Sequence, residues 1–161
     1  MDVCYAQPIY FQIGQFNMAA FAAAFLIALI ARDKRTSLLS VVTFFFFWLS
    51  VSFHCEIKAL DVDGVWRYFF WTSIDILYVF TVVCMARRGI VTALQLFLII
   101  SLHCVAWGMQ VFRLVDLHLL GSNHKEFYSL VITIYNAALW FVVAVPLAPW
   151  FMEKLRRSYS W

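Results

Sequence analysis

Long apolar runs alternate with short charged connections along the whole chain. Five runs have the length of about 20 residues that an α-helix needs to cross a bilayer, and they cover approximately residues 10–31, 38–58, 66–86, 90–116 and 127–151. None of the runs shows the strict apolar–polar alternation of a half-buried strand. The pattern therefore predicts an all-α fold, a single-domain integral membrane bundle of five transmembrane helices.

The connections between the runs differ in the sign of their charge. Eight of the 12 basic residues follow the first, third and fifth runs, namely Arg32, Lys34, Arg35, Arg87, Arg88, Lys154, Arg156 and Arg157. The other side of the predicted membrane collects most of the acidic residues. Because basic residues are retained on the cytoplasmic side, we expect the N-terminus outside and the C-terminus in the cytoplasm, as an odd number of spans requires.

Composition narrows the class of protein further. Hydrophobic residues make up 65% of the chain and charged residues only 13%, about half of the charged share of a soluble domain. The net charge of +3 is not gathered into one patch, so nucleic acid is not an expected partner. The first ten residues hold no Lys or Arg, and a secretory signal needs such residues. We expect a multi-pass protein of the lipid bilayer, taken as a bacterial inner membrane, with its first run retained.

The four cysteines give no sign of a disulfide framework. They are Cys4, Cys55, Cys84 and Cys104, they form no Cys-x-x-Cys pair, and three of them fall inside apolar runs. Buried cysteine usually behaves as a small hydrophobic residue. We therefore predict that these cysteines pack without forming disulfides.

One face of the fourth predicted span is polar along its whole length. At 100° per residue, its polar side chains fall within about 80° of one another on the helix; they are Thr92, Gln95, His103, Gln110 and Arg113. Polar groups are costly in hydrocarbon. We therefore expect this stripe to face a neighbouring helix or an ion or proton path, as a buried polar seam.

Asp75 is the carboxylate that lies nearest the middle of a predicted span. It is 14 residues before Gly89, and His103 is 14 residues after it. Because an α-helix rises about 1.5 Å per residue, a tight hairpin at Gly89 would bring both side chains to the same depth. The spacing predicts contact between Asp75 and His103.

Two further groups of residues mark candidate contacts. A secondary cluster, His54, Glu56 and Lys58, lies toward the predicted outer surface. On the first span, small residues recur every four positions, at Ala20, Ala24 and Ala28. Such a face lets another helix approach closely, either within the chain or from another subunit.

Three functions fit this pattern. A titratable Asp75–His103 pair favours an oligomeric pore or an ion- or proton-conducting, permeabilising protein without a cofactor. The same seam would also suit a non-catalytic partner-binding subunit, for instance an immunity, scaffold or assembly factor. Finally, His54 and His103 are the imidazoles that could bind haem or a metal ion in an electron-transfer subunit.

Catalysis is not predicted, because the sequence has no metalloprotease helix, phosphate-binding loop or Gly-x-Ser-x-Gly elbow. Five helices can bury one thin seam but hardly enclose a wide channel. We therefore expect a homo-oligomer or a larger membrane complex.

Overall fold

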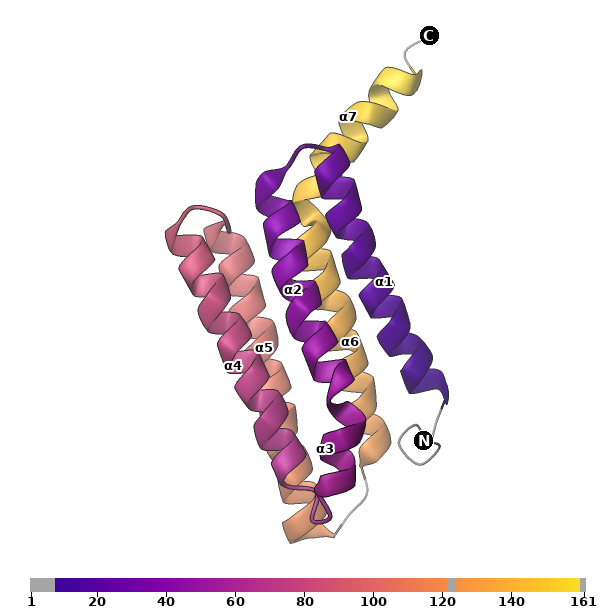
Figure 1. Cartoon of the computed structure of the whole chain (residues 1–161), viewed down its shortest axis with the longest axis vertical. Helices are drawn as coiled ribbons and strands as arrows, with labels where there is room; N and C mark the ends of the chain where they lie inside the picture. The colour runs from indigo at the N-terminus through magenta and orange to yellow at the C-terminus, as the bar shows by residue number, and fades with distance from the viewer. Residues whose placement is uncertain (1–7, 122–123, 160–161) are drawn as a thin grey trace.

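The computed structural model describes residues 8–121 and 124–159, and the regular elements of this part of the chain are all helices, without a strand (Figure 1). The elements in chain order are α1 (Pro8–Ile30), α2 (Lys34–Ser52), α3 (His54–Leu60), α4 (Trp66–Arg87), α5 (Ala93–Val115), a π-helical turn η1 (Asp116–Leu120), α6 (Lys125–Ala144), a 3₁₀ turn η2 (Val145–Leu147) and α7 (Ala148–Tyr159).

Four stretches of these helices are long and apolar enough to cross a membrane. They are Lys34–Leu60, Trp66–Arg87, Ala93–Leu120 and Lys125–Arg156. The first helix, α1, contributes a shorter described apolar stretch, Phe16–Ile30. The described part of the chain is thus all-helical, and its four long apolar helices are consistent with a multi-pass membrane protein.

Three of the five predicted runs contain an irregularity in the structure: one run is divided, and two continue through irregular helical turns. The second predicted run is divided at Phe53, where α2 ends and α3 begins. The fourth run continues through η1, and the last run continues through η2. Pro146 lies within η2, and proline lacks the N–H that a regular helix would use there.

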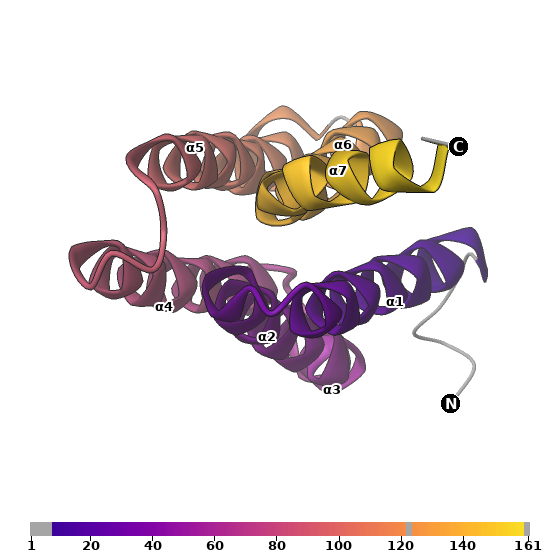
Figure 2. The ribbon, with the colours of Figure 1, turned by 90° about the horizontal axis from the view of Figure 1, so that it is seen from above.

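The helices form two layers, which are visible in Figure 2. One layer holds α4, α2 and α1, and the other holds α5 and α6. Contacts run within the layers, between α1 and α2 and between α5 and α6, and also across them, between α4 and α5 and between α2 and α6. Four helices therefore surround the interior that α2, α4, α5 and α6 share, and α1 lies at one side.

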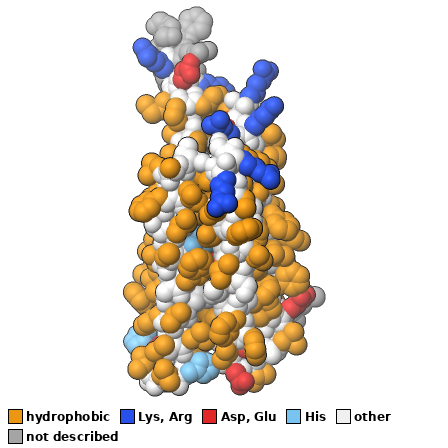
Figure 3. All heavy atoms as spheres, turned by 90° about the vertical axis from the view of Figure 1, so that its left-hand side faces the viewer, with side chains coloured by type: hydrophobic (Ala, Val, Ile, Leu, Met, Phe, Trp, Pro, Cys, Tyr) orange, Lys and Arg blue, Asp and Glu red, His pale blue; other side chains and the backbone are white. Residues whose placement is uncertain are grey.

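The apolar side chains are divided between this interior and the surface. Leu39, Val82, Ile99 and Val143 are no more than 1% exposed and come from all four central helices. Many large apolar side chains point outward instead, Phe97 among them at 67% exposure. Exposed apolar surface on this scale marks contact with a membrane or another protein. In Figure 3, a broad hydrophobic band separates a Lys- and Arg-rich end from an end with acidic and His side chains.

The small-residue face of α1 is turned toward the rest of the chain. Ala24 and Ala28 are 2% and 0% exposed, whereas Ala20 is half-buried. The neighbours that α1 contacts are α2 and α6. The face thus packs within the chain.

The prediction that all cysteines lack disulfides is wrong for Cys55, which is disulfide-bonded. Cys84 and Cys104 carry free thiols, and Cys4 lies outside the described residues. Sequence spacing does not reveal which thiols meet after folding, and Cys55 lies on the short helix α3 at the end of a span rather than in its middle.

The α4–α5 turn sets the depth of the polar residues on both helices. Gly89 has a left-handed φ of 70°, and its N–H donates to the carbonyl of Ala86 while the N–H of Ile90 donates to that of Met85. This pair of bonds is the Schellman arrangement that ends a helix abruptly, and glycine is the usual residue at its left-handed position. The turn therefore makes α4 and α5 a tight hairpin.

Candidate functional site

His103 lies at the centre of the bundle and is 1% exposed. Its Nδ1 is 2.8 Å from the carbonyl oxygen of Ile99, and its Nε2 is 2.8 Å from the hydroxyl of Tyr135 on α6. A carbonyl only accepts hydrogen bonds, so Nδ1 carries a proton and donates it. In the neutral ring Nε2 is then an acceptor, and the Tyr135 hydroxyl donates to it.

Asp75 on α4 approaches the same nitrogen. Its Oδ1 lies 3.9 Å from Nε2 of His103, within ion-pair range, and the hairpin at Gly89 places the two residues at the same depth. The Asp75 side chain is 21% exposed, against 1% for His103. The carboxylate therefore lies at the edge of the buried site rather than inside it.

A second pair of hydroxyls extends the site to α2. The Thr43 hydroxyl donates to the carbonyl of Leu39 at 2.8 Å and lies 2.9 Å from the Tyr78 hydroxyl. Because the one proton of Thr43 is already used, Tyr78 donates to Thr43. The ring of Tyr78 lies 5.0 Å from that of His103.

These contacts link all four central helices. We call the set the central cluster, and it consists of Thr43, Asp75, Tyr78, His103 and Tyr135. Aromatic and apolar groups enclose it: the Tyr135 and Trp107 rings lie 5.3 and 6.4 Å from that of His103, and Ala106 is 1% exposed. A hydrogen bond in such low-dielectric surroundings is strong, and an unsatisfied group there is costly.

The members of the predicted seam that lie nearest the α4–α5 turn have a local role in the structure. Thr92 and Gln95 form a capping box at the start of α5, in which each side chain bonds the other's backbone N–H. Gln95 Nε2 also lies 3.4 Å from the carbonyl of Val142 on α6. Both polar side chains are therefore used in the helix cap, and they do not belong to the central cluster.

The opposite end of the stripe contains a buried ion pair. Arg113 bonds Asp116, whose side chain is fully buried. His124 also bonds this carboxylate, through Nδ1 at 2.9 Å and its backbone N–H at 3.1 Å. We call Arg113, Asp116 and His124 the end cluster. Gln110 is 6% exposed, between the two clusters along α5, and its Oε1 has no partner within the described residues.

The members of the secondary cluster on α3 differ in their exposure. His54 stacks on Trp71 of α4, with ring centroids 5.2 Å apart and planes at 13°. Lys58 is half-buried and Glu56 is exposed. Glu56 is thus an exposed side chain of α3.

Asp61 is a buried acidic side chain in the connection between α3 and α4. It accepts hydrogen bonds from the backbone N–H groups of Val65, Trp66 and Arg67 at 3.0 to 3.1 Å. The Arg67 guanidinium lies 3.6 Å away. Burial raises the pKa of Asp61, but the three N–H donors and the Arg67 charge outweigh it and hold the pKa below the ordinary value of 3.8. Asp61 therefore caps α4 as a carboxylate.

Both candidate imidazole ligands make other contacts. His103 uses both ring nitrogens in hydrogen bonds, and His54 lies against Trp71. The part of the chain that the structure describes holds no group of three or more His, Cys, Asp or Glu side chains placed to bind a metal ion. Binding of haem or a metal by these imidazoles stays a prediction.

Sequence reasoning did not identify three hydroxyl-bearing members of the central cluster. Tyr78 and Tyr135 lie in apolar runs where aromatic residues are common, and Thr43 bonds its own helix as threonines in membrane helices often do. Asp116, in contrast, carries a visible signal. It follows Arg113 by three residues, the spacing at which opposite charges meet on a helix.

Comparisons of the chain with known protein families, with curated proteins and with solved structures gave no match. The geometry of the two clusters is therefore the basis on which we assign a function.

Proposed function

We propose that this chain is a small membrane protein that conducts protons through the central cluster. The observation that carries the proposal is the position of His103: it is buried where four helices meet, bonded to Tyr135 and 3.9 Å from the Asp75 carboxylate. Intramembrane charged and titratable groups are rare and usually functional. The site joins one such carboxylate to an imidazole, whose charge state is easily changed.

The hydrogen bonds define how one proton would move. In the neutral site, Tyr135 donates to Nε2 of His103. A proton passed from Asp75 would bind at Nε2, and the Tyr135 hydroxyl would rotate to accept a hydrogen bond from it. The proton then leaves Nε2 for the Tyr135 oxygen as Tyr135 releases its own hydroxyl proton to an acceptor on the other side, such as water, and Tyr135 again donates to Nε2 as in the first state. Nδ1 remains bonded to the Ile99 carbonyl in both states.

A proton suits this site better than a hydrated ion does. A proton moves between donors and acceptors without a shell of oxygen ligands, and the central cluster supplies a hydrogen-bonded His103–Tyr135 pair with the Asp75 carboxylate 3.9 Å from it. A metal cation would need several oxygen ligands in place of its water. On α5 the residues one turn away from His103 on each side, Ile99 and Ala106, are apolar and 0% and 1% exposed.

We further propose five spans, with the N-terminus outside and the C-terminus inside. The 23 residues of α1 extend about 35 Å as an α-helix, which is sufficient for a fifth span. The α1–α2 turn, the α4–α5 turn and α7 gather the basic residues at one end (Figure 3), as expected for a cytoplasmic side. The disulfide-bonded Cys55 on α3 lies at the other end (Figure 1), and disulfides persist in oxidising compartments such as the periplasm.

The exposure of Asp75 favours assembly with another subunit. Its side chain is 21% exposed, and a carboxylate that faces lipid near the middle of a span is costly. A second copy of this chain would cover it and turn the central clusters toward each other. A partner-binding subunit of a larger membrane complex is the second candidate that the same exposure supports.

Liposomes with the purified full-length chain test the conducting function. A potassium gradient with valinomycin supplies the driving force, and a trapped pH dye reports proton entry. We expect flux with the wild type and none with Asp75→Asn, whereas Asp63→Asn, which makes the same change in an exposed turn, leaves the flux unchanged. Equal flux from wild type and Asp75→Asn would refute the proposal, as would wild-type liposomes no more permeable than empty ones.

Mass determination in mild detergent tests the assembly. A defined homo-oligomer supports coverage of Asp75 by a second copy. Stoichiometric recovery of a different membrane protein supports the subunit function instead. A strictly monomeric chain contradicts both.

A further inference from the structure

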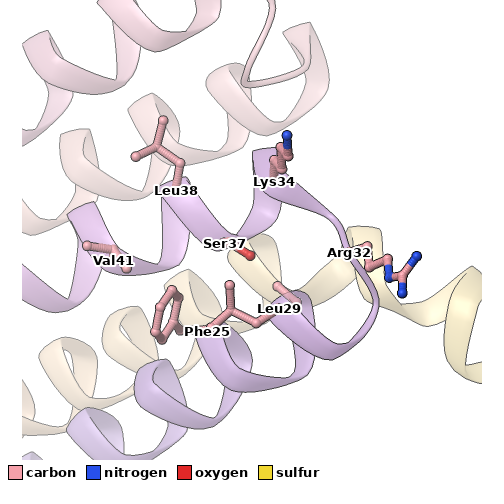
Figure 4. A pocket seen from close by; sticks show the side chains of 8 residues that line it. Phe25, Leu29, Arg32, Lys34, Ser37, Leu38 and Val41 are labelled. Carbon is pink, nitrogen blue, oxygen red and sulfur yellow. The ribbon is translucent and has the colours of Figure 1, made fainter.

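An apolar groove lies on the surface between α1 and α2, close to their connecting turn (Figure 4). It has a volume of about 490 Å³, within the range of small-molecule binding sites. Phe25, Ala28 and Leu29 line it from α1, and Ser37, Leu38 and Val41 line it from α2. Leu29, Leu38 and Val41 are 41 to 51% exposed, so the groove is open to the surrounding lipid along its length.

Two cations stand at the turn end of this groove. Arg32 and Lys34 belong to its lining, and both are exposed. In Figure 4 the Arg32 guanidinium points away from the apolar side chains, toward the end of the helices. The site thus combines an apolar channel along the helices with positive charge at the level where they end.

The one acidic residue of the turn forms no ion pair with either of these cations. Asp33 is the N-cap of α2 and accepts hydrogen bonds from the backbone N–H groups of Arg35 and Thr36 and from the Thr36 hydroxyl. Among the described residues, Arg32 and Lys34 form no ion pair, whereas Arg67, His103, Arg113 and His124 each lie within ion-pair distance of a carboxylate.

The backbone of Arg32 has a strained, left-handed conformation. Its φ is 58°, and it is the non-glycine residue with positive φ among those that the structure describes. Arg32 N–H donates to the carbonyl of Leu29, and Asp33 N–H donates to that of Ala28, the same helix ending that Gly89 provides in the α4–α5 turn. A side chain in this conformation costs roughly 1–2 kcal/mol. Strain of this kind tends to persist at functional sites.

We propose that the groove between α1 and α2 is a binding site for an anionic phospholipid. One acyl chain lies along Phe25, Leu29 and Val41, and the phosphate-bearing headgroup lies against Arg32 and Lys34. Charge complementarity selects an anionic lipid over a zwitterionic one, because three basic residues, Arg32, Lys34 and Arg35, outnumber the one carboxylate of the turn, Asp33, where the headgroup would lie. This site is separate from the central cluster, and the proposal does not depend on proton conduction.

Native mass spectrometry of the full-length chain in mild detergent tests the site. The protein is titrated with phosphatidylglycerol and with phosphatidylcholine of the same acyl chains. Each cation near an anionic headgroup contributes about 1 kcal/mol, so we expect the first phosphatidylglycerol to bind about 30-fold more tightly than phosphatidylcholine. Equal affinity for the two lipids would overturn the proposal.

Arg32→Gly is the decisive variant, because it removes the charge and relieves the strain together. We expect thermal stability to hold or rise while the preference for phosphatidylglycerol falls about fivefold. Arg88→Gly, at the end of α4 beside Gly89, removes the same charge at the same end of the bundle and should leave the preference unchanged. An equal loss in both variants would show that the basic end attracts anionic lipid without a site, which contradicts the proposal.

The apolar part of the site is tested by Leu38→Trp, which fills the groove from an exposed position on α2. We expect it to abolish the first phosphatidylglycerol site while the basic residues remain. Retention of that site, in a variant as thermally stable as the wild type, would also overturn the proposal.

Discussion

The central cluster and the end cluster are both buried and both contain a His and an Asp, yet they are built in opposite ways. The end cluster is local: Asp116 bonds residues three and eight positions away. The central cluster is non-local: His103 and Tyr135 are 32 positions apart, and Thr43 and Tyr78 are 35 apart. Local contacts end a helix or close a loop. Non-local ones exist only in the assembled bundle, and they bring one carboxylate to the edge of the buried site.

Because the two clusters are built differently, substitutions in them should have different consequences. Loss of a buried local ion pair should reduce stability without changing conduction. Loss of a central hydrogen bond should reduce conduction in a protein that still folds. The predictions below test this separation.

The largest effect is expected for Asp116→Ala. The substitution leaves Arg113, whose side chain is 7% exposed, without its buried counter-charge, which costs about 3–5 kcal/mol. Thermal or detergent-induced unfolding measures the loss, with Asp63→Ala as the exposed control. Proton flux per folded molecule should remain at the wild-type level. If Asp116→Ala lowered the flux per folded molecule as much as Asp75→Asn does, the two clusters would not differ in function.

His103→Phe should suppress conduction strongly, as Asp75→Asn does. The phenyl ring keeps the shape of the side chain but cannot carry a proton, and a positioned proton-transfer group contributes on the order of 100-fold in rate. His118→Phe, on the exposed face of η1, is the matched control and should conduct normally. Wild-type flux from His103→Phe would assign the central cluster to packing alone.

Asp61 provides a pH-dependent test at a local site. Its folded pKa lies below 3.8, so its contribution is fully present above the unfolded pKa and is lost as pH falls through the folded value. Replacing a capping carboxylate by Ala costs about 1–2 kcal/mol. We expect Asp61→Ala to be less stable than wild type at pH 7, and the difference to shrink below about pH 4. Unfolding curves at both pH values check this, and a difference that grows in acid would contradict the assigned cap.

The smallest effect is the coupling between His103 and Tyr135. Interhelical hydrogen bonds in membranes contribute about 0.6–2 kcal/mol, and a double-mutant cycle with His103→Phe and Tyr135→Phe isolates this energy. The same cycle with Tyr128 in place of Tyr135 serves as the control, because Tyr128 contacts Tyr68 rather than His103. Additive effects for both pairs would mean that the Tyr135 bond contributes no stability.

The apolar periodicity alone predicts the helical membrane architecture, because few arrangements other than membrane-spanning helices can accommodate such long apolar runs. Counting from Gly89 leads to the Asp75–His103 pair, because a tight hairpin preserves depth on both sides of the turn. The same counting does not lead to Tyr135, because the π-helical turn η1 follows α5 and breaks the regular register between α5 and α6. The apolar pattern also did not predict the irregularities at Phe53 and Pro146, which interrupt regular helices within two of the predicted spans. The Cys55 disulfide depends on a contact that residue spacing does not reveal.

The reversal potential of the reconstituted wild-type chain tests proton conduction most directly. The protein is placed in a planar bilayer with a tenfold proton gradient and identical salt on both sides, and the voltage at which the protein-dependent current vanishes is measured. If protons carry the current, we predict a value near the proton equilibrium potential, about 59 mV in magnitude. A reversal at zero voltage, or one that follows an imposed potassium or chloride gradient instead, would contradict proton conduction through the central cluster.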